Sequence, residues 1–406
     1  MVSEESAKAE ALRLEVRAWL AANLPKGWGT PEYVPLERLT EEGERQGKEW
    51  QKKLYEAGYT GFGIPKEYGG VERPAGEVAI IQGELIRRGT PPGPTSLGPL
   101  MVVQTLLREG QEWQKKRFIP KILSGEECWC EGFSEPDAGS DLANTQTTGV
   151  RDGDEWVVNG QKVWSSASKF ADWGLLVVKT DPEAPRHRNL SYFVFDCTSP
   201  GFSRRPLRQM SGEAEFGEMF FDDMRIPHEN MIGEEGRGWY VAMTTLQAER
   251  GGGGGGAAAI AGLDLRALGG LGGVDSLIEL AKNTRRYGKT VWEDASFRQR
   301  IAQFAIENQA MRFSGIRMGF RMRKGQLTGN EVSMGKVFSS EGRKRRGDMT
   351  MEIIGAYSQL IRGDKRAVDD GAQVYAMLRA RGATIEMGTS EINRNIIAER
   401  ILGLPR

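Results

Sequence analysis

Hydrophobic residues follow a helical spacing at both ends of the chain and gather in short β-prone runs in its middle. Near the start, Leu12, Val16, Trp19 and Leu20 recur every three or four positions, which predicts a surface helix. The segment from about 126 to 235 instead carries short β-prone runs at 156–158, 175–178 and 192–195. Helical spacing returns from about 236 to the end. The pattern therefore predicts an α+β chain with segregated elements and not alternating βαβ units.

Three domains are expected from this order: an N-terminal helical domain (1–125), a middle β domain (126–235) and a C-terminal helical domain (236–406). At 406 residues the chain is long for a single domain, and two or three packed units suit that length. Asp152-Gly153 and Asn159-Gly160 bracket the first β-prone run, and both pairs predict hairpin turns.

Composition and charge limit the classes of function. Lys and Arg total 55, as do Asp and Glu, so no bulk field favours nucleic acid or an anionic membrane. No apolar run approaches the roughly 20 residues that span a bilayer, and the acidic N-terminus resembles neither a signal nor a transit peptide. Three cysteines are too few for a disulfide framework. We therefore expect a cytoplasmic protein without a membrane span or a metal site.

The scarcity of histidine also removes most hydrolytic mechanisms. His187 and His228 are the two histidines of the chain, and neither lies in the nucleophile motif of a Ser-His-Asp triad. No G-x-G-x-x-G motif follows a strand, so a nicotinamide site of the Rossmann type is not expected. The chemistry that remains is a carboxylate base that works beside a cofactor.

A run of glycines at 251–256 lacks the G-K-[ST] sequence and the preceding strand of a phosphate-binding loop. Each glycine costs a helix about 1 kcal/mol relative to alanine. Two interpretations stay open. The run is either a helix held by tertiary packing, whose missing side chains leave space beside a ligand, or a flexible loop.

Two segments of the middle region gather polar groups that suit a flat cofactor. Residues 133–141 (FSEPDAGSD) combine hydroxyls, turn formers and backbone donors, and residues 159–166 (NGQKVWSS) add an indole and two hydroxyls. Either segment alone could be a capped turn or a strand with a packed tryptophan. Together and in this order they resemble the flavin-contacting segments of the acyl-CoA dehydrogenase family. Further matching segments extend the resemblance over nearly the whole chain, at 64–70, 118–125, 388–392 and 395–406.

The resemblance implies the fold of that family: an N-terminal helical domain, a middle domain of barrel-like or sandwich form, and a C-terminal four-helix bundle. FAD would lie in a cleft among them and across a dimer interface. The positions that carry over to binding of the chain's own FAD are Phe133, Ser134, Ser140, Trp164, Ser165, Ser166, Thr389 and Glu391.

Each of these positions has an implied place on the cofactor. Phe133 and Ser134 would contact the isoalloxazine, Trp164 would flank it, and Ser166 would approach its N5 edge. Ser140 would lie near the pyrophosphate or the substrate thioester. Thr389 and Glu391 match positions near the FAD phosphates and ribityl chain.

The catalytic base is expected at a position that only part of the family uses. In much of the family the base precedes the Gly-Thr-Ser of the last motif, where this chain has Met387. Glu386 lies one residue earlier, and on a helix that step turns the side chain by roughly 100°. A second pattern, like that of the isovaleryl- and long-chain enzymes, places the base just before an arginine at the start of the third domain. Glu249 and Arg250 match it, with Arg250 as a substrate-binding residue.

The resemblance thus implies that Glu249 takes the Cα proton of an acyl-CoA thioester while a hydride leaves Cβ for flavin N5. A dry site should raise the pKa of this carboxyl toward the working pH. The alternative is that Glu249 is a surface salt-bridge partner.

Two segments depart from the family pattern where it serves the FAD of a neighbouring subunit. In the first, Thr284 stands at the usual arginine position, which leaves Arg285 or Arg286 to substitute, beside Tyr287. In the second, Glu352 stands where the family has glutamine, three residues before Gly355. An acidic side chain near a pyrophosphate is unfavourable unless it faces a ribose hydroxyl.

These departures leave the assembly open. The chain could form a homotetramer or homodimer with altered contacts. It could also be the catalytic subunit of an α₂β₂ assembly in which a sister chain completes each FAD site, an arrangement that some enzymes of steroid side-chain breakdown resemble.

The family further implies lipid β-oxidation and an electron-transfer flavoprotein as acceptor. Two rival functions remain: a flavin oxidase or monooxygenase on the same fold, and a non-catalytic subunit that binds acyl-CoA.

Overall fold

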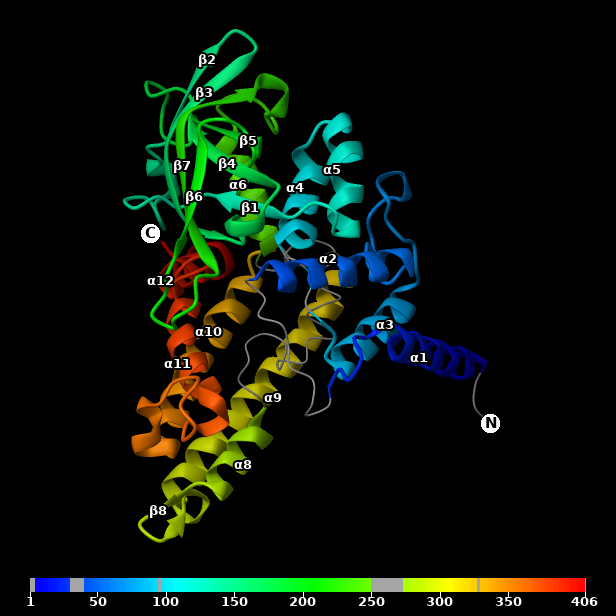
Figure 1. Cartoon of the computed structure of the whole chain (residues 1–406), viewed down its shortest axis with the longest axis vertical. Coiled ribbons are helices and arrows are strands. Elements are labelled where there is room, and N and C mark those ends of the chain that lie inside the picture. Colours follow the sequence, from blue (N-terminus) through cyan, green and yellow to red (C-terminus); the bar gives the residue numbers. More distant parts are fainter. Residues whose placement is uncertain are drawn as a thin grey trace. The chain divides into compact units, whose positions relative to one another are not determined.

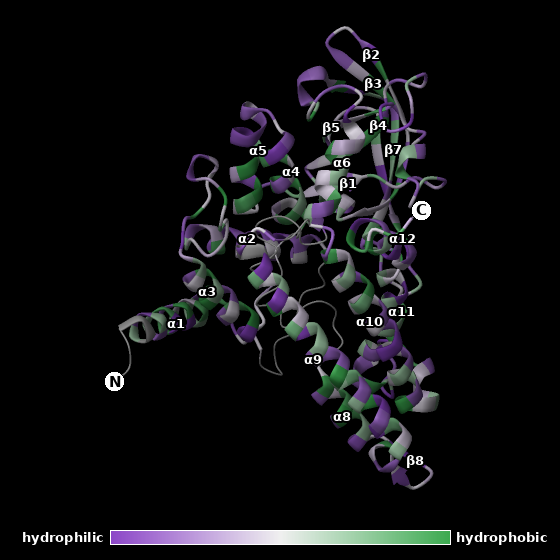
Figure 2. Ribbon diagram, turned by 180° about the vertical axis from the view of Figure 1, so that it is seen from behind, coloured by the Kyte–Doolittle hydropathy of each residue, from purple (hydrophilic) through white to green (hydrophobic). Residues whose placement is uncertain are grey.

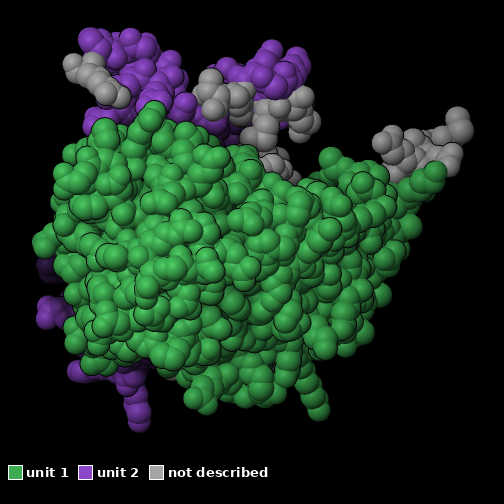
Figure 3. All heavy atoms as spheres, turned by 90° about the horizontal axis from the view of Figure 1, so that it is seen from above, with its two compact units in different colours: residues 1–258 green, residues 259–406 purple. Residues whose placement is uncertain are grey.

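The computed structural model describes residues 4–29, 40–91, 93, 97–249, 273–326 and 329–405. The chain divides into two compact units, residues 1–258 and 259–406 (Figure 3). Each unit has hydrophobic clusters of its own. Helices precede and follow the strands along the chain, in the order that the sequence pattern predicts (Figure 1).

Helices open the first unit. They are α1 (Glu4–Asn23), α2 (Glu41–Glu56), α3 (Ala75–Arg88), α4 (Val103–Glu109) and α5 (Glu112–Ser124), with the short turns η1 (Lys66–Tyr68) and η2 (Gly98–Val102). Thr40 begins α2 by accepting a hydrogen bond from the backbone N of Gly43 at 3.1 Å. Gly125 ends α5 in the left-handed conformation. The predicted N-terminal helix is confirmed, with Val16 and Leu20 of α1 in a buried cluster.

The middle of the chain forms one seven-stranded sheet in the order β1-β4-β2-β3-β7-β6, with β5 paired to β4. The strands are β1 (Trp129–Gly132), β2 (Thr148–Asp152), β3 (Glu155–Ser166), β4 (Trp173–Lys179), β5 (Leu190–Asp196), β6 (Phe202–Leu207) and β7 (Phe216–Pro227). The predicted turn at Asp152-Gly153 is confirmed, because it joins β2 to β3 in an antiparallel hairpin. The outer end of this hairpin is hydrophilic (Figure 2).

The turn predicted at Asn159-Gly160 is wrong. Both residues lie inside β3, where the register against β7 shifts by a bulge. A Cβ on Gly160 would come within 2.5 Å of the Thr147 hydroxyl, so glycine is needed there for the close approach of two chain segments. The Asn-Gly pair thus marks a bulge in a long strand instead of its end.

β4 and β5 are buried on both faces, because two hydrophobic clusters share them. Leu175 of β4 and Tyr192 of β5 belong to a cluster that α4, α5 and α6 (Gly238–Gln247) cover. Their neighbours Leu176 and Phe193 belong to a second cluster, built mainly by residues of the sheet itself. A strand with two buried faces reads as a continuous apolar run, which explains why these segments of the sequence do not alternate.

The second unit is helical. It contains α8 (Val274–Asn283), α9 (Ala295–Arg323), α10 (Val332–Ile354), α11 (Ala372–Ala383) and α12 (Ser390–Ile396), with a short hairpin of β8 (Arg285–Arg286) and β9 (Lys289–Thr290). Leu277, Ile301, Ile353 and Val374 bring α8, α9, α10 and α11 together in one buried cluster. Within the described ranges, no helix combines the length and the apolar character needed to cross a bilayer.

A substitution of Phe118, on α5, tests how much the hydrophobic cluster between the helices and the sheet contributes to stability. It is 1% exposed, and its ring meets Trp129 and Trp173 with centroids 5.1 and 4.9 Å away. We expect Phe118→Ala to lower the free energy of unfolding by about 3–5 kcal/mol through lost burial and a residual cavity. Denaturant unfolding followed by tryptophan fluorescence measures this loss. Leu14→Ala, at a position 58% exposed on α1, is the control, and an equal loss there would contradict the role of Phe118.

Candidate active site

A buried ion pair shapes the segment that carries the first group of predicted site residues. Lys162 of β3 is fully buried, and its Nζ donates to Glu135 Oε1 at 2.8 Å and to the carbonyl of Phe133 at 3.0 Å. Glu135 also accepts hydrogen bonds from the backbone N of Gln146 and of Thr147, at 2.5 and 2.9 Å. The pair therefore fixes both ends of the 133–147 segment to β3.

The attraction between the two charges of this pair opposes the free-energy cost of burying them. Burial lowers the pKa of Lys162 to about 8, although Glu135 acts in the opposite direction. Burial alone would raise the pKa of Glu135, but Lys162 and the backbone N–H donors outweigh it, so this pKa lies below its usual range. The pair stays ionised at neutral pH because every charged group in it is hydrogen-bonded.

Phe133 and Ser134 follow β1 and lie beside β3. The backbone N of Val163 donates to the carbonyl of Ser134 at 2.8 Å. The ring of Phe133 is 7% exposed and packs edge-on against Tyr192, so little of it is open to a ligand. Ser134 is half-buried. The structure thus places Phe133 and Ser134 next to the β3 residues that the sequence assigned to the same cofactor.

Trp164, Ser165 and Ser166 lie at the end of β3, where a second bulge interrupts the pairing with β7. Trp164 has a φ of 62° and is 54% exposed, with its indole edge-on to Phe216. A bulky residue at positive φ is strained, and such strain is common at functional sites. Among the described residues, the buried hydroxyl of Ser165 has no hydrogen-bond partner. An exposed indole and a hydroxyl without a partner are groups that can contact a flat ring such as an isoalloxazine.

Ser140 lies apart from this group, at an exposed bend. The neighbouring Asp141 pairs with Arg186, which ties the bend to the segment between β4 and β5. No hydrogen bond of the Ser140 hydroxyl is found within the described part of the chain. The hydroxyl is therefore available to an external phosphate or carbonyl group.

Glu249 lies just beyond α6, on the side of the helix that faces the sheet. Thr245 is fully buried, and its hydroxyl lies 3.0 Å from that of Tyr192 and 2.8 Å from that of Thr105. The helical backbone continues through Ala248, so Glu249 follows Thr245 by one turn on the same face. Glu249 is half-buried. Arg250 lies outside the described residues.

Glu131 of β1 is a carboxyl group of this region that the sequence analysis missed. Burial raises its pKa well above the usual range, and the charge of Glu249 adds to that effect. Its Oε2 is buried and has no hydrogen-bond partner among the described residues. The signal in the sequence was a single acidic residue among Trp129, Cys130 and Phe133, at the start of the β region.

The last motif of the chain lies in the second unit, at the start of α12. Thr389 caps this helix by accepting a hydrogen bond from the backbone N of Ile392 at 3.1 Å. Glu391 is exposed, and hydrogen bonds from its own backbone and from Thr389 lower its pKa. Glu386 accepts a hydrogen bond from Arg379 at 2.9 Å, so its carboxylate is held within this unit.

The segments that depart from the family pattern also meet in the second unit. Arg286 of the β8–β9 hairpin donates to the carbonyl of Glu352 at 2.7 Å, while the carboxylate of Glu352 makes two hydrogen bonds to Arg300 at 2.5 and 2.9 Å. Tyr287 is 99% exposed, and the neighbouring Arg285 donates to the carbonyl of Gly288.

Gly355 follows α10 at φ 60° and ψ −128°, a conformation that favours glycine. Because Arg300 neutralises Glu352, that position does not present a free negative charge.

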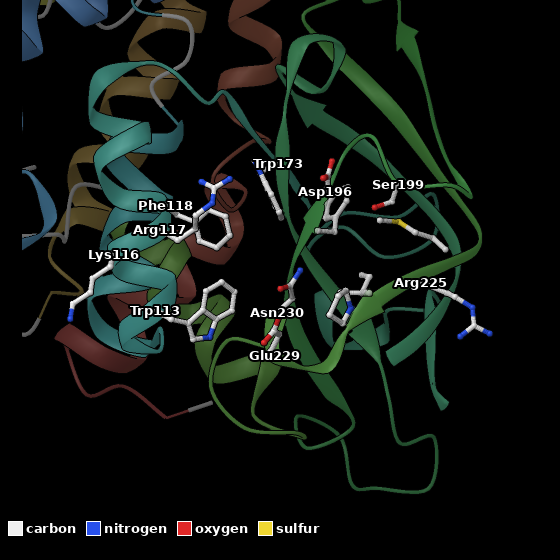
Figure 4. Close-up of a pocket in the computed structure, with 14 residues that line it drawn as sticks. Trp113, Lys116, Arg117, Phe118, Trp173, Asp196, Ser199, Arg225, Glu229 and Asn230 are labelled. Atoms are coloured by element: carbon white, nitrogen blue, oxygen red, sulfur yellow. The ribbon is translucent and has the colours of Figure 1, made fainter. Parts of the chain in front are cut away.

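A separate pocket of about 780 Å³ lies between α5 and the sheet (Figure 4). Trp113 and Phe118 of α5 and Trp173 of β4 line one side, and Asp196 and Arg225 lie on the other. No residue that the sequence assigned to cofactor or substrate lines this pocket. It is therefore not the candidate active site. Among the described residues, no group of three His, Cys, Asp or Glu side chains could hold a metal ion.

Comparisons with known proteins agree with this architecture. Profiles of the acyl-CoA dehydrogenase N-terminal, middle and C-terminal domains match residues 6–126, 130–224 and 236–402. The chain is 34% identical to acyl-CoA dehydrogenase IpdE1 of Mycobacterium tuberculosis, over 98% of both chains. The predicted α+β fold class, with helical, β and helical domains in sequence, is confirmed.

Two solved structures share this fold over nearly the full chain. One is described as the Tcur3481–Tcur3483 steroid ACAD, with a TM-score of 0.78 and 30% identity, covering 98% of both chains. The other is the ChsE4–ChsE5 complex of Mycobacterium tuberculosis, with a TM-score of 0.75 and 30% identity, again covering 98% of both chains.

Mutation of Lys162 tests how much its ion pair with Glu135 contributes to stability and to the order of residues 133–147. Lys162→Met leaves the carboxylate of Glu135 buried without its cation, and breaking a buried pair in this way costs about 3–5 kcal/mol. We expect that loss in the free energy of unfolding, together with faster proteolysis within residues 133–147. Lys162→Met/Glu135→Gln should recover part of it. Lys179→Met removes one exposed hydrogen bond from a lysine to the uncharged side chain of Gln146, and a loss no larger than in this control would contradict the proposed role of the pair.

Proposed function

Because the chain belongs to the acyl-CoA dehydrogenase family, we propose that it removes two hydrogens from neighbouring carbons of an acyl-CoA thioester, with Glu249 as the base that takes the Cα proton. The observation that supports this most strongly is the place of Glu249. It is half-buried, one helical turn beyond a threonine that is hydrogen-bonded to the sheet, on the side of α6 that faces Tyr192 and Phe133.

A base in this position suits proton abstraction from a weak carbon acid. An acyl Cα–H becomes acidic enough only when the thioester carbonyl is held by hydrogen bonds. Glu249 is half-buried, and its charge acts on a second carboxyl, that of Glu131. In general, burial and a neighbouring carboxyl bring a carboxylate toward the pKa that a general base needs near neutral pH. The competing carboxylate, Glu386, is engaged by Arg379.

FAD would supply the acceptor for the hydride that leaves Cβ. Within the first unit, Trp164 offers an open aromatic face, and the hydroxyls of Ser134, Ser165 and Ser166 offer donors for a ring edge. The unpartnered hydroxyl of Ser165 supports this assignment. Phe133 contributes mainly its backbone, because its ring is buried in the core.

The other predicted positions would hold the remaining parts of FAD and substrate. Thr389 and Glu391 would lie near the phosphates and ribityl chain, and Ser140 and Arg250 near the phosphate or thioester groups. Positions that would serve the FAD of a neighbouring chain are Arg285, Tyr287, Glu352 and Gly355. The fully exposed Tyr287 is suited to contact another chain.

We propose that the chain assembles through α9. Ile306, Phe313 and Phe320 of this helix recur every seven residues and are 63%, 62% and 57% exposed. A seven-residue apolar repeat is typical of a helix that packs against another helix, and a row of exposed large apolar side chains marks an interaction surface. The related ChsE4–ChsE5 structure is a complex of two different chains. That precedent, with the altered positions at Thr284 and Glu352, supports a sister chain as the partner.

The same comparisons support a bulky substrate. A relative with the same fold is described as a steroid ACAD, and six consecutive glycines follow Arg250, where side chains would otherwise occupy space. We propose a bulky acyl group of the steroid side-chain type, an electron-transfer flavoprotein as acceptor, and a role in lipid β-oxidation.

An anaerobic absorbance titration with acyl-CoAs tests the reaction and its base. We expect one class of acyl-CoA to bleach the oxidised-flavin spectrum of the wild-type protein. Glu249→Gln removes the proton acceptor, and the loss of a general base slows such a step by about 100- to 10,000-fold. Glu386→Gln, which removes the other candidate carboxylate, should bleach at the wild-type rate.

Other outcomes of this titration would support the rival functions. Normal bleaching by Glu249→Gln would show that the base lies elsewhere. Rapid reoxidation of the bleached flavin by air would support an oxidase or monooxygenase. A colourless protein that takes up no FAD, even with a sister chain, would support a non-catalytic subunit.

The assembly is tested by a charge on α9. Phe313→Glu places a carboxylate in the exposed apolar row, so we expect a smaller particle than the wild type by light scattering after gel filtration. Leu14→Glu, at a comparably exposed apolar position on α1, is the control and should leave the mass unchanged. A wild-type chain that forms a stable homo-oligomer with FAD bound at every subunit would contradict the need for a sister chain.

A further inference from the structure

Glu131 lies on the face of β1 that packs against helices. Trp129 and Phe133, two residues away on either side, belong to the cluster covered by α4, α5 and α6. Cys130 and Gly132 point the other way, since Cys130 belongs to the second cluster and a Cβ on Gly132 would meet Leu176. Side chains alternate along a strand. The carboxyl of Glu131 therefore enters a face of the sheet that is mainly apolar.

This carboxyl is poorly compensated there. Its Oε2 is buried without a hydrogen-bond partner, and no ion pair of Glu131 is found within the described part of the chain. The residue as a whole is half-buried. An ionised carboxylate without partners is costly in such surroundings. A neutral carboxyl that donates its proton to a neighbour is not.

The neighbouring carboxyl is that of Glu249. Tyr192 connects the two sides: its ring packs edge-on against Phe133, which follows β1, and its hydroxyl lies 3.0 Å from that of Thr245. Glu249 follows Thr245 by one turn of the helix that lies against β4 and β5 (Figure 1). The charge of Glu249 acts on Glu131, and the charge of Glu131 acts on Tyr192. Glu131, Tyr192 and Glu249 are thus neighbouring groups on the helix-facing side of the sheet.

The other titratable groups near β1 do not neutralise Glu131. Lys162 lies beside Gly132, under the opposite face of the strand, where it is paired with Glu135. Lys169, on the adjoining turn η4 (Ser168–Phe170), is exposed and lies over the ring of Phe170. The turn η2, which also contacts β1, carries no titratable side chain. α4 contributes Glu109, which accepts a hydrogen bond from Thr244 on another side of α6.

We propose that Glu131 is a positioning residue that shares a proton with the catalytic carboxylate Glu249. Before reaction the two carboxyls hold one proton, which Glu131 carries and donates to Glu249. When the Cα–H bond of the acyl-CoA breaks, the proton forms an O–H bond on Glu249 and the electron pair stays with the acyl group, so the pair then holds two protons. The proposal rests on the role of Glu249 as base, but Glu131 itself takes no proton from the substrate.

Sharing a proton gives the site a defined charge. Two carboxyls that interact strongly titrate as a pair, with one apparent pKa lowered and the other raised. Between these values the pair carries a single negative charge, and Glu249 can accept a proton. Above the upper value both groups ionise. Negative charge that builds on the thioester is then repelled by two carboxylates, so proton abstraction should slow again at alkaline pH.

The test separates proton abstraction from oxidation. An acyl-CoA with a quaternary β-carbon has an α-proton to lose but no β-hydride to give, so its exchange in deuterated water reports the base alone. We expect a bell-shaped pH dependence of exchange in the wild type. In Glu131→Gln the alkaline limb should be lost. The exchange rate at the optimum should fall by no more than about tenfold, a change equivalent in free energy to about one pKa unit. The amide keeps the shape and one hydrogen bond of the carboxyl.

Infrared spectra of the substrate-free protein give a second readout. A carbonyl stretch of a protonated carboxyl should persist at neutral pH and disappear in Glu131→Gln, whereas Glu155→Gln, at a carboxylate exposed on β3, should leave it unchanged. An unaltered alkaline limb in Glu131→Gln, or a wild-type spectrum without a protonated carboxyl, would overturn the proposal even if Glu249→Gln abolishes exchange. Full exchange in Glu249→Gln would instead remove Glu249 as the base.

Discussion

The buried contact between Lys162 and Glu135 is the constraint on which the candidate site depends. It joins a long strand to the loop that follows β1, and it does so with charges that water cannot reach. The backbone groups of Phe133, Gln146 and Thr147 complete the contact. Because Lys162 and Glu135 are buried and hydrogen-bonded to each other, their contact favours one position of the loop relative to β3. The open indole of Trp164 and the hydroxyls near it are thereby held in a fixed arrangement.

The helix that carries Glu249 is positioned by a different kind of contact. Here neutral hydroxyls of Thr105, Tyr192 and Thr245 meet in the core and connect α4, β5 and α6. One charged contact therefore fixes the wall that we assign to the cofactor, and one neutral network fixes the base. Phe133 connects the two contacts, because its carbonyl accepts a hydrogen bond from Lys162 and its ring packs against Tyr192.

Much of this organisation could be predicted from the sequence. The change from helical spacing to β-prone runs and back gave the order of the domains, since helices buried on one face repeat every three or four residues and strands buried on both faces read as short apolar runs. The turn predicted at Asn159-Gly160 was wrong, because an Asn-Gly pair suits both a tight turn and a bulge. Only the close approach of Thr147 to Gly160 distinguishes the two structures. Glu131 was overlooked because its neighbours in sequence suggest an ordinary buried strand. Its importance comes from Glu249, more than a hundred residues away along the chain.

The two-sided burial of β4 and β5 has a consequence for how this protein can be divided. These strands contribute to the core that the N-terminal helices cover and also to the core inside the sheet. The N-terminal helices and the sheet therefore form one cooperative folding unit, although family profiles assign them to separate domains. A chimera that exchanges the first 125 residues with those of a relative would divide a shared core. Such a chimera should keep its core only if Phe118, Trp129 and Trp173, whose rings pack together, are exchanged as a set.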